Sequence, residues 1–313
     1  MLTFRKIVVD EVKPHTLLDK FIYFFYKVDG KLLRLCVDFI PDERYLSWKV
    51  RHNLGYKMDF KNPLTFNAKL QWLKLYNRKP EFTQMVDKIE VKDYVASIIG
   101  EKYIIRTLGV WDRIEDIDWN GFPQSFVLKN SGDSGGVVVC KDKSKLDISK
   151  AIKKLTSCKG GNYIKYNKEY PYLNVNNRFI AEEYKEDESG LELKDYKFFC
   201  FNGEPKMIFV ASDRQIGATK FDFYDLEWNH LNLRQEYPNN PNGIPKPKNL
   251  DEMLEVARKL SKGFPHIRVD LYNCDGEIYF GELTFFHNSG TFPWYPEEWD
   301  YKMGEWIELP PSK

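Results

Sequence analysis

The segment from Ile267 to Gly290 constrains the fold of this chain more than any other part of the sequence. Apolar residues alternate with polar ones on both sides of the dipeptide Asp275-Gly276. An alternation with a period of two predicts strands with one buried face, and Asp-Gly between two such runs predicts a β-hairpin. We therefore expect two antiparallel strands joined by a tight turn.

The length of that turn determines which charged side chains share a face. A two-residue loop would place Asp270 and Glu282 on opposite faces, because side chains alternate along a strand. A three-residue loop, Cys274-Asp275-Gly276 with Gly276 left-handed, would place both carboxylates and Arg268 together. We predict this second arrangement.

Two carboxylates on one face imply a particular chemistry. They repel each other unless a cation lies between them, and hard oxygen ligands suit Mg²⁺ shared with phosphate oxygens. An arginine beside them would stabilise charge on a transferring phosphoryl group. The hairpin therefore predicts Asp270 and Glu282 as metal ligands and Arg268 as the catalytic cation. The alternative is an exposed hairpin whose charges are merely solvated.

A glycine-rich loop follows a second apolar strand. The strand ends in Lys129, glycines follow at Gly132, Gly135 and Gly136, and a further apolar strand begins at Val137. Such glycines let successive backbone N–H groups point into one concavity, which can bind phosphate oxygens. The pattern is not a Walker motif, in which Gly-Lys-Ser/Thr precedes a helix. We expect a flap that closes over phosphates, and the alternative is an ordinary glycine-rich turn.

Several motifs occur in a defined order along roughly residues 60 to 310. They are Asn62–Trp72, Asp87-Lys88, Val127–Gly136, Glu182–Lys185, Asp195–Gly203, Arg268-x-Asp270 and Gly281–Phe285. This order resembles the ATP-grasp enzymes, and the longer phrases are similar to the TupA-like group found in polysaccharide loci. The resemblance implies an α+β chain with the ATP-grasp fold of two α+β lobes, preceded by a mainly helical N-terminal region.

The resemblance also implies ATP and Mg²⁺ as cofactors. The residues it assigns to nucleotide binding are Lys88, Lys129, Ser131, Gly132, Ser134, Gly135, Gly136, Glu182, Glu183, Lys185 and Asp195. The two lysines would hold the phosphates, and the loop from Ser131 to Gly136 would cover them. Backbone groups of Glu183 and Lys185 would contact the adenine edge, and Asp195 the ribose.

Two positions depart from the family pattern. ATP-grasp enzymes usually carry Asn two residues after the metal-binding Glu, and this chain has Thr284 there, whose hydroxyl is a poorer metal ligand. Ala68 stands where we expect Glu. The first departure bears on a second metal position.

The implied reaction is the ATP-dependent joining of a carboxylate to an amine through an acyl phosphate, with ADP as product. The implied substrates are a small-molecule or sugar carboxylate, such as a uronic acid in surface polysaccharide synthesis, and an amine such as an amino acid. A nucleotide-linked or lipid-linked sugar is a further candidate. The alternatives are a glycosyltransferase of a polysaccharide locus and a nucleotide-binding protein without turnover.

Other polar residues of the second half of the chain are substrate candidates. They are Lys197, Arg214 and Lys220 among the predicted strands, and Ser289 and Gly290 after the hairpin. His287 is a candidate base. For each charged or titratable side chain the alternative is a solvated or structural role.

Composition excludes several classes of protein. Lys and Arg number 47 against 46 acidic residues, a balance that argues against nucleic-acid binding. Five scattered cysteines, without Cys-x-x-Cys spacing, predict neither a disulfide framework nor a zinc site. The longest apolar run, Phe21 to Tyr26, is too short to span a bilayer. We expect a cytoplasmic protein, with peripheral membrane contact as an option.

The chain divides into three predicted regions. Residues 1–80 are a mainly helical region, 81–185 a small lobe with the flap, and 186–313 a large lobe with the magnesium and ATP site. In the first region, apolar residues from Leu17 to Phe25 fall at helical spacing with lysines between them. Such a helix could lie on a membrane surface, but we expect it to pack on its own protein. In the large lobe we expect Asn249 to cap a helix.

Overall fold

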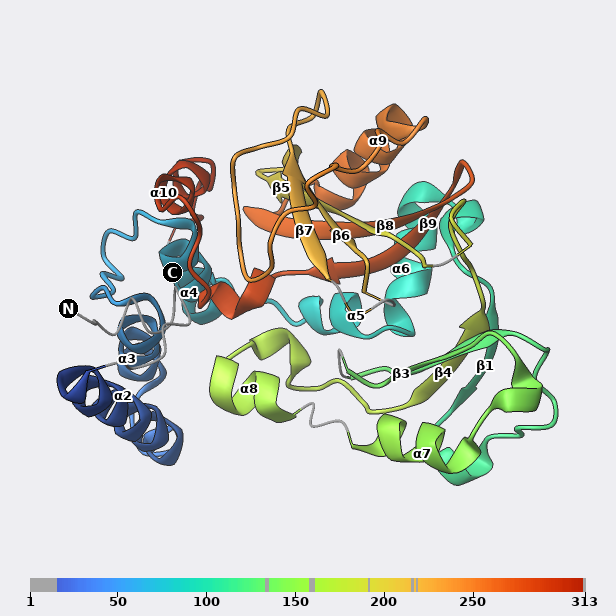
Figure 1. Cartoon of the computed structure of the whole chain (residues 1–313), viewed down its shortest axis with the longest axis horizontal. Coiled ribbons are helices and arrows are strands. Elements are labelled where there is room, and N and C mark those ends of the chain that lie inside the picture. The colour runs from blue at the N-terminus through green and yellow to red at the C-terminus, as the bar shows by residue number, and fades with distance from the viewer. Residues whose placement is uncertain are drawn as a thin grey trace.

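The computed structural model describes residues 16–132, 135–157, 161–190, 192–214, 217 and 219–311. Two antiparallel sheets face each other, and a helical region extends from one end (Figure 1). The position of Ser134, a predicted flap residue, lies outside the described residues. Among the described residues, no helix is both long enough and apolar enough to cross a membrane.

The first part of the chain is helical, as predicted. Its helices are α2 (Leu17–Cys36), α3 (Asp42–Leu54), α4 (Phe66–Tyr76), α5 (Phe82–Val86) and α6 (Glu90–Ile99). The hydroxyl of Thr16 accepts from the N–H of Asp19, whose side chain accepts in return, so a capping box begins α2. Gly100 ends α6, as its position in the sequence indicates.

Helix α2 packs on α3, as expected, through buried Leu33, but much of its apolar surface stays exposed. Phe21 is 60% exposed, Leu35 is 69% exposed, and other apolar residues along the helix are exposed as well. Helical periodicity gives the apolar face of a helix but not the partner that covers it.

The small lobe is a four-stranded sheet with a helix on one face. Its strands β1 (Thr107–Trp111), β2 (Phe126–Asn130), β3 (Val137–Cys140) and β4 (Phe179–Glu183) are antiparallel in the order β1-β4-β2-β3. Helix α7 (Ile148–Thr156) packs Leu155 into a core with Phe126 and Leu128. A shorter helix, α8 (Gly161–Asn167), follows it.

The large lobe is a five-stranded antiparallel sheet in the order β7-β6-β5-β8-β9. The strands are β5 (Asp195–Phe201), β6 (Glu204–Ser212), β7 (Lys220–Tyr224), β8 (His266–Cys274) and β9 (Glu277–Thr284). Helix α9 (Leu250–Ser261) covers one face, where Met253 and Leu260 join the main core with Phe198 and Val269. The other face points toward the small lobe (Figure 1).

The remaining elements are short. They are α10 (Glu298–Glu305) and the 3-10 helices η1 (Glu101–Tyr103), η2 (Ile114–Asp116), η3 (Lys143–Lys145), η4 (Tyr170–Tyr172) and η5 (His287–Gly290).

Asn249 stands at the N-cap position of α9 but does not cap it, contrary to our expectation. Its side chain instead bonds Gly276 and Asn273 of the β8–β9 hairpin. An N-cap side chain that has hydrogen-bond partners elsewhere in the fold need not bond the N–H groups of its own helix.

The β8–β9 turn is shorter than predicted. Cys274 pairs with Glu277, so the loop has two residues, and both have the positive φ of a type I′ turn. Asp270 nevertheless faces Glu282 directly, because the register shifts at Gly281. A Cβ at this position would lie 3.0 Å from the carbonyl oxygen of Asp270. The predicted loop length was wrong. The β-bulge at Gly281 instead places Asp270 and Glu282 on one face of the sheet, as the longer loop was expected to do.

Candidate active site

A cavity of about 500 Å³ lies between the two sheets. The sheet register brings a row of charged residues to it, since Lys197 pairs with Asp270 and Asp270 pairs with Glu282. Side chains alternate along each strand, so these three residues share the face opposite α9. We call this space the central cavity.

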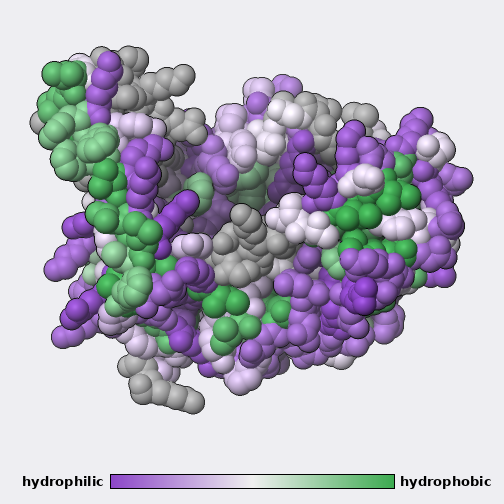
Figure 2. All heavy atoms as spheres, turned by 90° about the horizontal axis from the view of Figure 1, so that it is seen from below, coloured by the Kyte–Doolittle hydropathy of each residue, from purple (hydrophilic) through white to green (hydrophobic). Residues whose placement is uncertain are grey.

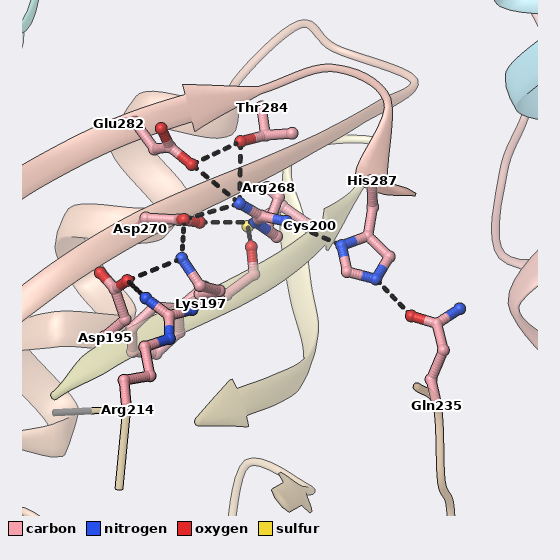
Figure 3. Close-up of polar contacts among 11 residues, drawn as sticks. Asp195, Lys197, Cys200, Arg214, Gln235, Arg268, Asp270, Glu282, Thr284 and His287 are labelled. Carbon is pink, nitrogen blue, oxygen red and sulfur yellow. Dashed lines mark hydrogen bonds and ion pairs between the residues drawn. The ribbon is translucent and has the colours of Figure 1, made fainter. Parts of the chain in front are cut away.

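Arg268 lies beside this row and contacts two of its members, Asp270 and Glu282 (Figure 3). Its Nε donates to Asp270 Oδ1 at 2.7 Å and its Nη2 to Asp270 Oδ2 at 2.7 Å. The same Nη2 lies 3.0 Å from both Glu282 Oε1 and Thr284 Oγ1. Although burial lowers the pKa of Arg268, Asp270 and Glu282 raise it above its usual value. The guanidinium is therefore a permanent, rigidly held cation.

A second chain of ion pairs runs along β5. Lys197 Nζ pairs with Asp270 Oδ2 and lies 3.1 Å from Asp195 Oδ2. Arg214 Nη1 donates to the same Asp195 oxygen at 2.8 Å. Together with Arg268 and Glu282, these side chains form a cluster of three cations and three carboxylates that balance in charge (Figure 3).

His287 in η5 extends the cluster away from the carboxylates. Its Nδ1 lies 2.7 Å from Arg268 Nη1, and its Nε2 lies 2.6 Å from Gln235 Oε1. Arginine only donates, so Nδ1 accepts and the proton resides on Nε2. Burial lowers the pKa of His287 well below its usual value, and nearby Arg268 lowers it further. With both nitrogens engaged, the residue orients Arg268 rather than offering a free base.

The small lobe contributes positive charge from the opposite side. Glu182 on β4 is buried between Lys129 and Lys92, whose Nζ atoms each lie 2.5 Å from one of its oxygens. Burial raises the pKa of Glu182, but the two lysines lower it to below its usual value. Two cations around one carboxylate leave a net positive charge at this wall.

An apolar slot of about 230 Å³ adjoins the central cavity. Val127, Val139 and Tyr272 line it, together with Glu183 and Lys185 at the end of β4. The N–H of Glu183 already donates to Arg106 O at 3.0 Å, and Lys185 lies beyond the last ladder pair. Apolar walls beside a strand end suit a flat aromatic base.

The first residues of the flap, Ser131 and Gly132, are held by the segment 176–178. Ser131 is buried, donates to Asn176 O at 2.9 Å and accepts from the N–H of Arg178 at 3.0 Å. A Cβ on Gly132 would lie 2.1 Å from Asn177 Oδ1, whereas one on Gly135 would meet nothing within 4 Å. Gly136 accepts from the N–H of Asn130 at 2.8 Å and so closes the β2–β3 hairpin.

The structure brings Lys88, Asp195, Lys197 and Arg214 to the central cavity but not every substrate candidate. Lys220 begins β7 opposite Ser212 and does not line the cavity. Ser289 lies beside Lys74, whose Nζ is 2.8 Å from the serine Oγ. A Cβ on Gly290 would lie 2.5 Å from Gln71 Nε2. The last two residues serve the contact between η5 and α4.

The carboxylates of the cavity are better suited to a Mg²⁺ ion that also binds phosphate oxygens than to an ion bound by protein ligands alone. Among the described residues, no group of three or more His, Cys, Asp or Glu is arranged to hold a metal. Both oxygens of Asp270 are engaged by Arg268 and Lys197. Glu282 is 46% exposed and lines the cavity, and Mg²⁺ in phosphate sites often uses one or two carboxylates. Glu282 would hold the ion with phosphate oxygens, and Asp270 would join only after Lys197 moved.

Three polar side chains of the cavity escaped the sequence analysis: Lys92, Tyr272 and Asn288. Lys92 lies four residues after Lys88, a spacing that places two side chains on one helical face and could have indicated it. For Tyr272, two residues after Asp270 on the same strand face, the alternation of β8 was a usable signal. Asn288 lies in an irregular segment without a periodic signal.

Two lobes that each present a sheet to one charged cavity define the ATP-grasp class of fold. The family described as TupA-like ATPgrasp matches residues 68–308. The chain therefore belongs to this family, and the predicted family and fold are confirmed. No curated protein matches the sequence.

Solved structures of ATP-grasp ligases are similar in fold. D-alanine–D-alanine ligase from Bacillus anthracis, complexed with ATP, is 15% identical with a TM-score of 0.37 over 70% of this chain. The corresponding enzyme from Helicobacter pylori is 16% identical with a TM-score of 0.43, over 80% of this chain and 69% of its own. The ligase PsnB, with minimal precursor, Mg and ADP, is 12% identical with a TM-score of 0.38, over 82% of this chain and 66% of its own. The chain spans 55% of the length of the Bacillus anthracis enzyme.

Proposed function

We propose that this chain is an ATP-dependent carboxylate–amine ligase. One observation carries the proposal: cations from both lobes converge on a single cavity beside an apolar slot. Lys88, Lys92 and Lys129 come from the small-lobe side, and Lys197 and Arg268 from the large sheet. Phosphoryl transfer needs positioning and charge neutralisation more than covalent chemistry from the protein.

In this proposal the apolar slot holds adenine and the central cavity holds the triphosphate. Lys129 and Lys88 bind phosphate oxygens, and Asp195 bonds the ribose. The incoming phosphates offer Lys197 an anionic partner that competes with Asp270. Mg²⁺, held by Glu282 and phosphate oxygens, would neutralise charge on the transferred group.

The reaction proceeds in two steps. A substrate carboxylate attacks the γ-phosphorus, the bond to the bridging β-phosphate oxygen breaks, and ADP leaves. An amine then attacks the acyl phosphate carbon, inorganic phosphate leaves, and the amine loses a proton as the amide forms. Arg268 stabilises the charge on the phosphoryl group and on the tetrahedral adduct, because its guanidinium is held by Asp270 and His287.

The family context suggests the substrate classes. We propose a sugar carboxylate such as a uronic acid, free or carried on a nucleotide or lipid, and an amine such as an amino acid, joined during surface polysaccharide synthesis. ATP is the phosphoryl donor, so we place the reaction in the cytoplasm. This substrate assignment rests on analogy within the family.

Product analysis tests the reaction. The protein is incubated with ATP, Mg²⁺ and a panel of uronic acids and amino acids, and nucleotides are measured by mass spectrometry. We expect carboxylate-dependent ADP, and hydroxylamine should trap the acyl phosphate as a hydroxamate. Arg268→Lys retains a charge but loses the two-pronged contact with Asp270, so turnover should fall far more than ATP affinity. AMP as product, or sugar transfer from a nucleotide sugar without ATP consumption, contradicts the proposal.

A second candidate is nucleotide binding without turnover. Both carboxylate oxygens of Asp270 already contact cations, which leaves this residue poorly placed to bind a metal. Thr284, whose hydroxyl donates to Glu282 Oε1 at 3.3 Å, stands where a metal-binding amide is usual. ATP binding in calorimetry, without ADP release for any carboxylate, would support this candidate.

A further inference from the structure

A second cavity lies in the helical region, largely outside the segment that matches the family. It has a volume of about 770 Å³, is open to solvent on one side and is lined by α2, α3 and the end of α8. Lys27, Lys31, Arg34, Lys49 and His52 line it, and no Asp or Glu of the described residues does. This N-terminal cavity is therefore suited to an anion.

Side chains of the cavity are held in place by other protein groups. Lys49 Nζ donates to Tyr166 O at 2.6 Å and to Asn167 Oδ1 at 2.5 Å. His52 stacks on Tyr26 with ring centroids 4.3 Å apart, and its Nδ1 lies 2.7 Å from Asp29 Oδ2. Gly30 gives this histidine room, since a Cβ there would lie 3.1 Å from His52 Nε2.

Three cations of α2 have no carboxylate partner among the described residues. Lys27, Lys31 and Arg34 are exposed and share one helical face, at positions i, i+4 and i+7. Among the described residues, none of the three forms an ion pair with Asp or Glu. Lys27 Nζ lies 5.1 Å from the ring centroid of Tyr23. Within the described part of the chain, no ion pair thus compensates the charge of these three side chains.

An apolar strip adjoins this row of cations. It consists of exposed side chains at helical spacing along α2 and just beyond it: Leu17, Phe21, Phe24, Leu32, Leu35 and Phe39. Figure 2 shows hydrophobic surface running along this end of the molecule, with hydrophilic residues beside it. Lys31 and Arg34 each precede a residue of the strip by one position, so the row of cations runs beside the strip. Exposed apolar patches of this kind mark interaction surfaces.

We propose that α2 lies on an anionic membrane surface, with the apolar strip among acyl chains and the N-terminal cavity around a phosphate group of a lipid. A helix with an apolar face beside a basic row fits the boundary between acyl chains and anionic headgroups. A second copy of the chain would bring the same cation row to the interface, and like charges repel. This inference does not depend on the ligase reaction, although it would bring a lipid-carried acceptor to the protein.

Vesicle flotation of the full chain tests the membrane surface. We expect flotation with vesicles of equal parts phosphatidylcholine and phosphatidylglycerol, and none with phosphatidylcholine alone. The triple variant Lys27→Gln, Lys31→Gln and Arg34→Gln should bind on the order of 100-fold more weakly, from about fivefold per lost charge. Phe21→Ser with Leu35→Ser should also lose binding. Matched controls are Lys150→Gln with Lys153→Gln on α7, and Leu64→Ser with Leu173→Ser, all of which change exposed residues elsewhere.

Each other outcome overturns the proposal in a distinguishable way. Equal binding to both vesicle types, or unchanged binding of the α2 variants, excludes the anionic surface. Self-association that is lost in the Phe21→Ser and Leu35→Ser variant, without vesicle binding, assigns the strip to a second copy. Calorimetric binding of inorganic phosphate that needs Lys31 and Arg34, without vesicle binding, assigns the cavity to a soluble anion. ATP affinity should stay unchanged in every α2 variant, so this test is separate from that of the ligase.

Discussion

Glu182 is a buried carboxylate clamped by two lysines, and this clamp determines where the small lobe offers charge. Lys92 on α6 and Lys129 on β2 reach it from different elements. A buried carboxylate needs such partners, because an isolated charge in the interior is costly. The arrangement holds the ends of both lysines at the wall of the central cavity.

Replacing Lys129 with Ala should weaken MgATP binding about 10- to 100-fold, because a contact to a charged group contributes about 1.5–3 kcal/mol. Isothermal titration calorimetry measures the effect, and Lys150→Ala on the exposed face of α7 is the control. The variant leaves Glu182 with one cation, so Lys129→Ala/Glu182→Gln should recover stability without recovering affinity. Recovery of both would mean that Lys129 acts only on the fold.

His287 should remain neutral from pH 5 to 8, with its proton on Nε2. Its pKa in the folded protein lies well below the unfolded value, so only the unfolded chain takes up a proton as the pH falls through about 6.5. Its contribution to stability is therefore present at neutral pH and declines at lower pH, by about 1–2 kcal/mol at pH 5. Nitrogen-15 NMR of the ring checks the tautomer. A titration midpoint near 6.5 for this residue would contradict the network with Arg268 and Gln235.

At the scale of elements, α10 anchors the start of α4. Asp300 accepts from the N–H of Asn67 at 2.8 Å and from its side-chain amide at 3.0 Å. Gly304 packs so closely on the residues before α4 that a Cβ would lie 2.1 Å from Leu64 O. Because α4 also contacts η5 through Gln71, this anchor supports the segment that carries His287.

Gly304→Ala should lower the free energy of unfolding by about 2–3 kcal/mol, because the added methyl group overpacks a rigid backbone contact. Urea unfolding measures the change. Gly135→Ala is the matched control, since a Cβ there meets nothing within 4 Å, and it should change stability by less than about 1 kcal/mol. A neutral Gly304→Ala would show that α10 can move away from α4 without cost.

At the scale of the whole molecule, the proposed nucleotide site belongs to neither lobe alone. The central cavity is lined by Lys129 and Glu182 from one sheet and by Asp195, Arg268 and Glu282 from the other. A ligand that fills it should therefore restrict the motion of both lobes relative to each other.

A non-hydrolysable ATP analogue with Mg²⁺ should raise the melting temperature and slow amide exchange in both lobes. At a concentration 100 times Kd, binding to the native state alone stabilises it by about 2.7 kcal/mol. Hydrogen–deuterium exchange should report protection in residues 126–140 and also in 195–201 and 266–284. Protection limited to one sheet would contradict a shared site, and Lys129→Ala should reduce protection in both.

The sequence alone determined the elements and their faces. Alternation along residues 267–285 predicted the hairpin, and the order of motifs indicated the ATP-grasp fold now confirmed. It also placed Arg268, Asp270 and Glu282 together, although by the wrong turn. These signals are local, because the period of a strand or helix is written in neighbouring residues.

The tertiary structure decided what local periodicity does not encode. The bulge at Gly281 sets the register of Glu282, and the packing of α6 on α9 and η1 holds Lys92 where it reaches Glu182. Only the assembled sheet shows that Arg268 and Lys197 occupy the carboxylate of Asp270. Only the packing of the helices shows that the apolar strip of α2 is exposed. Contacts between residues far apart in sequence depend on how elements pack, and no single segment carries that information.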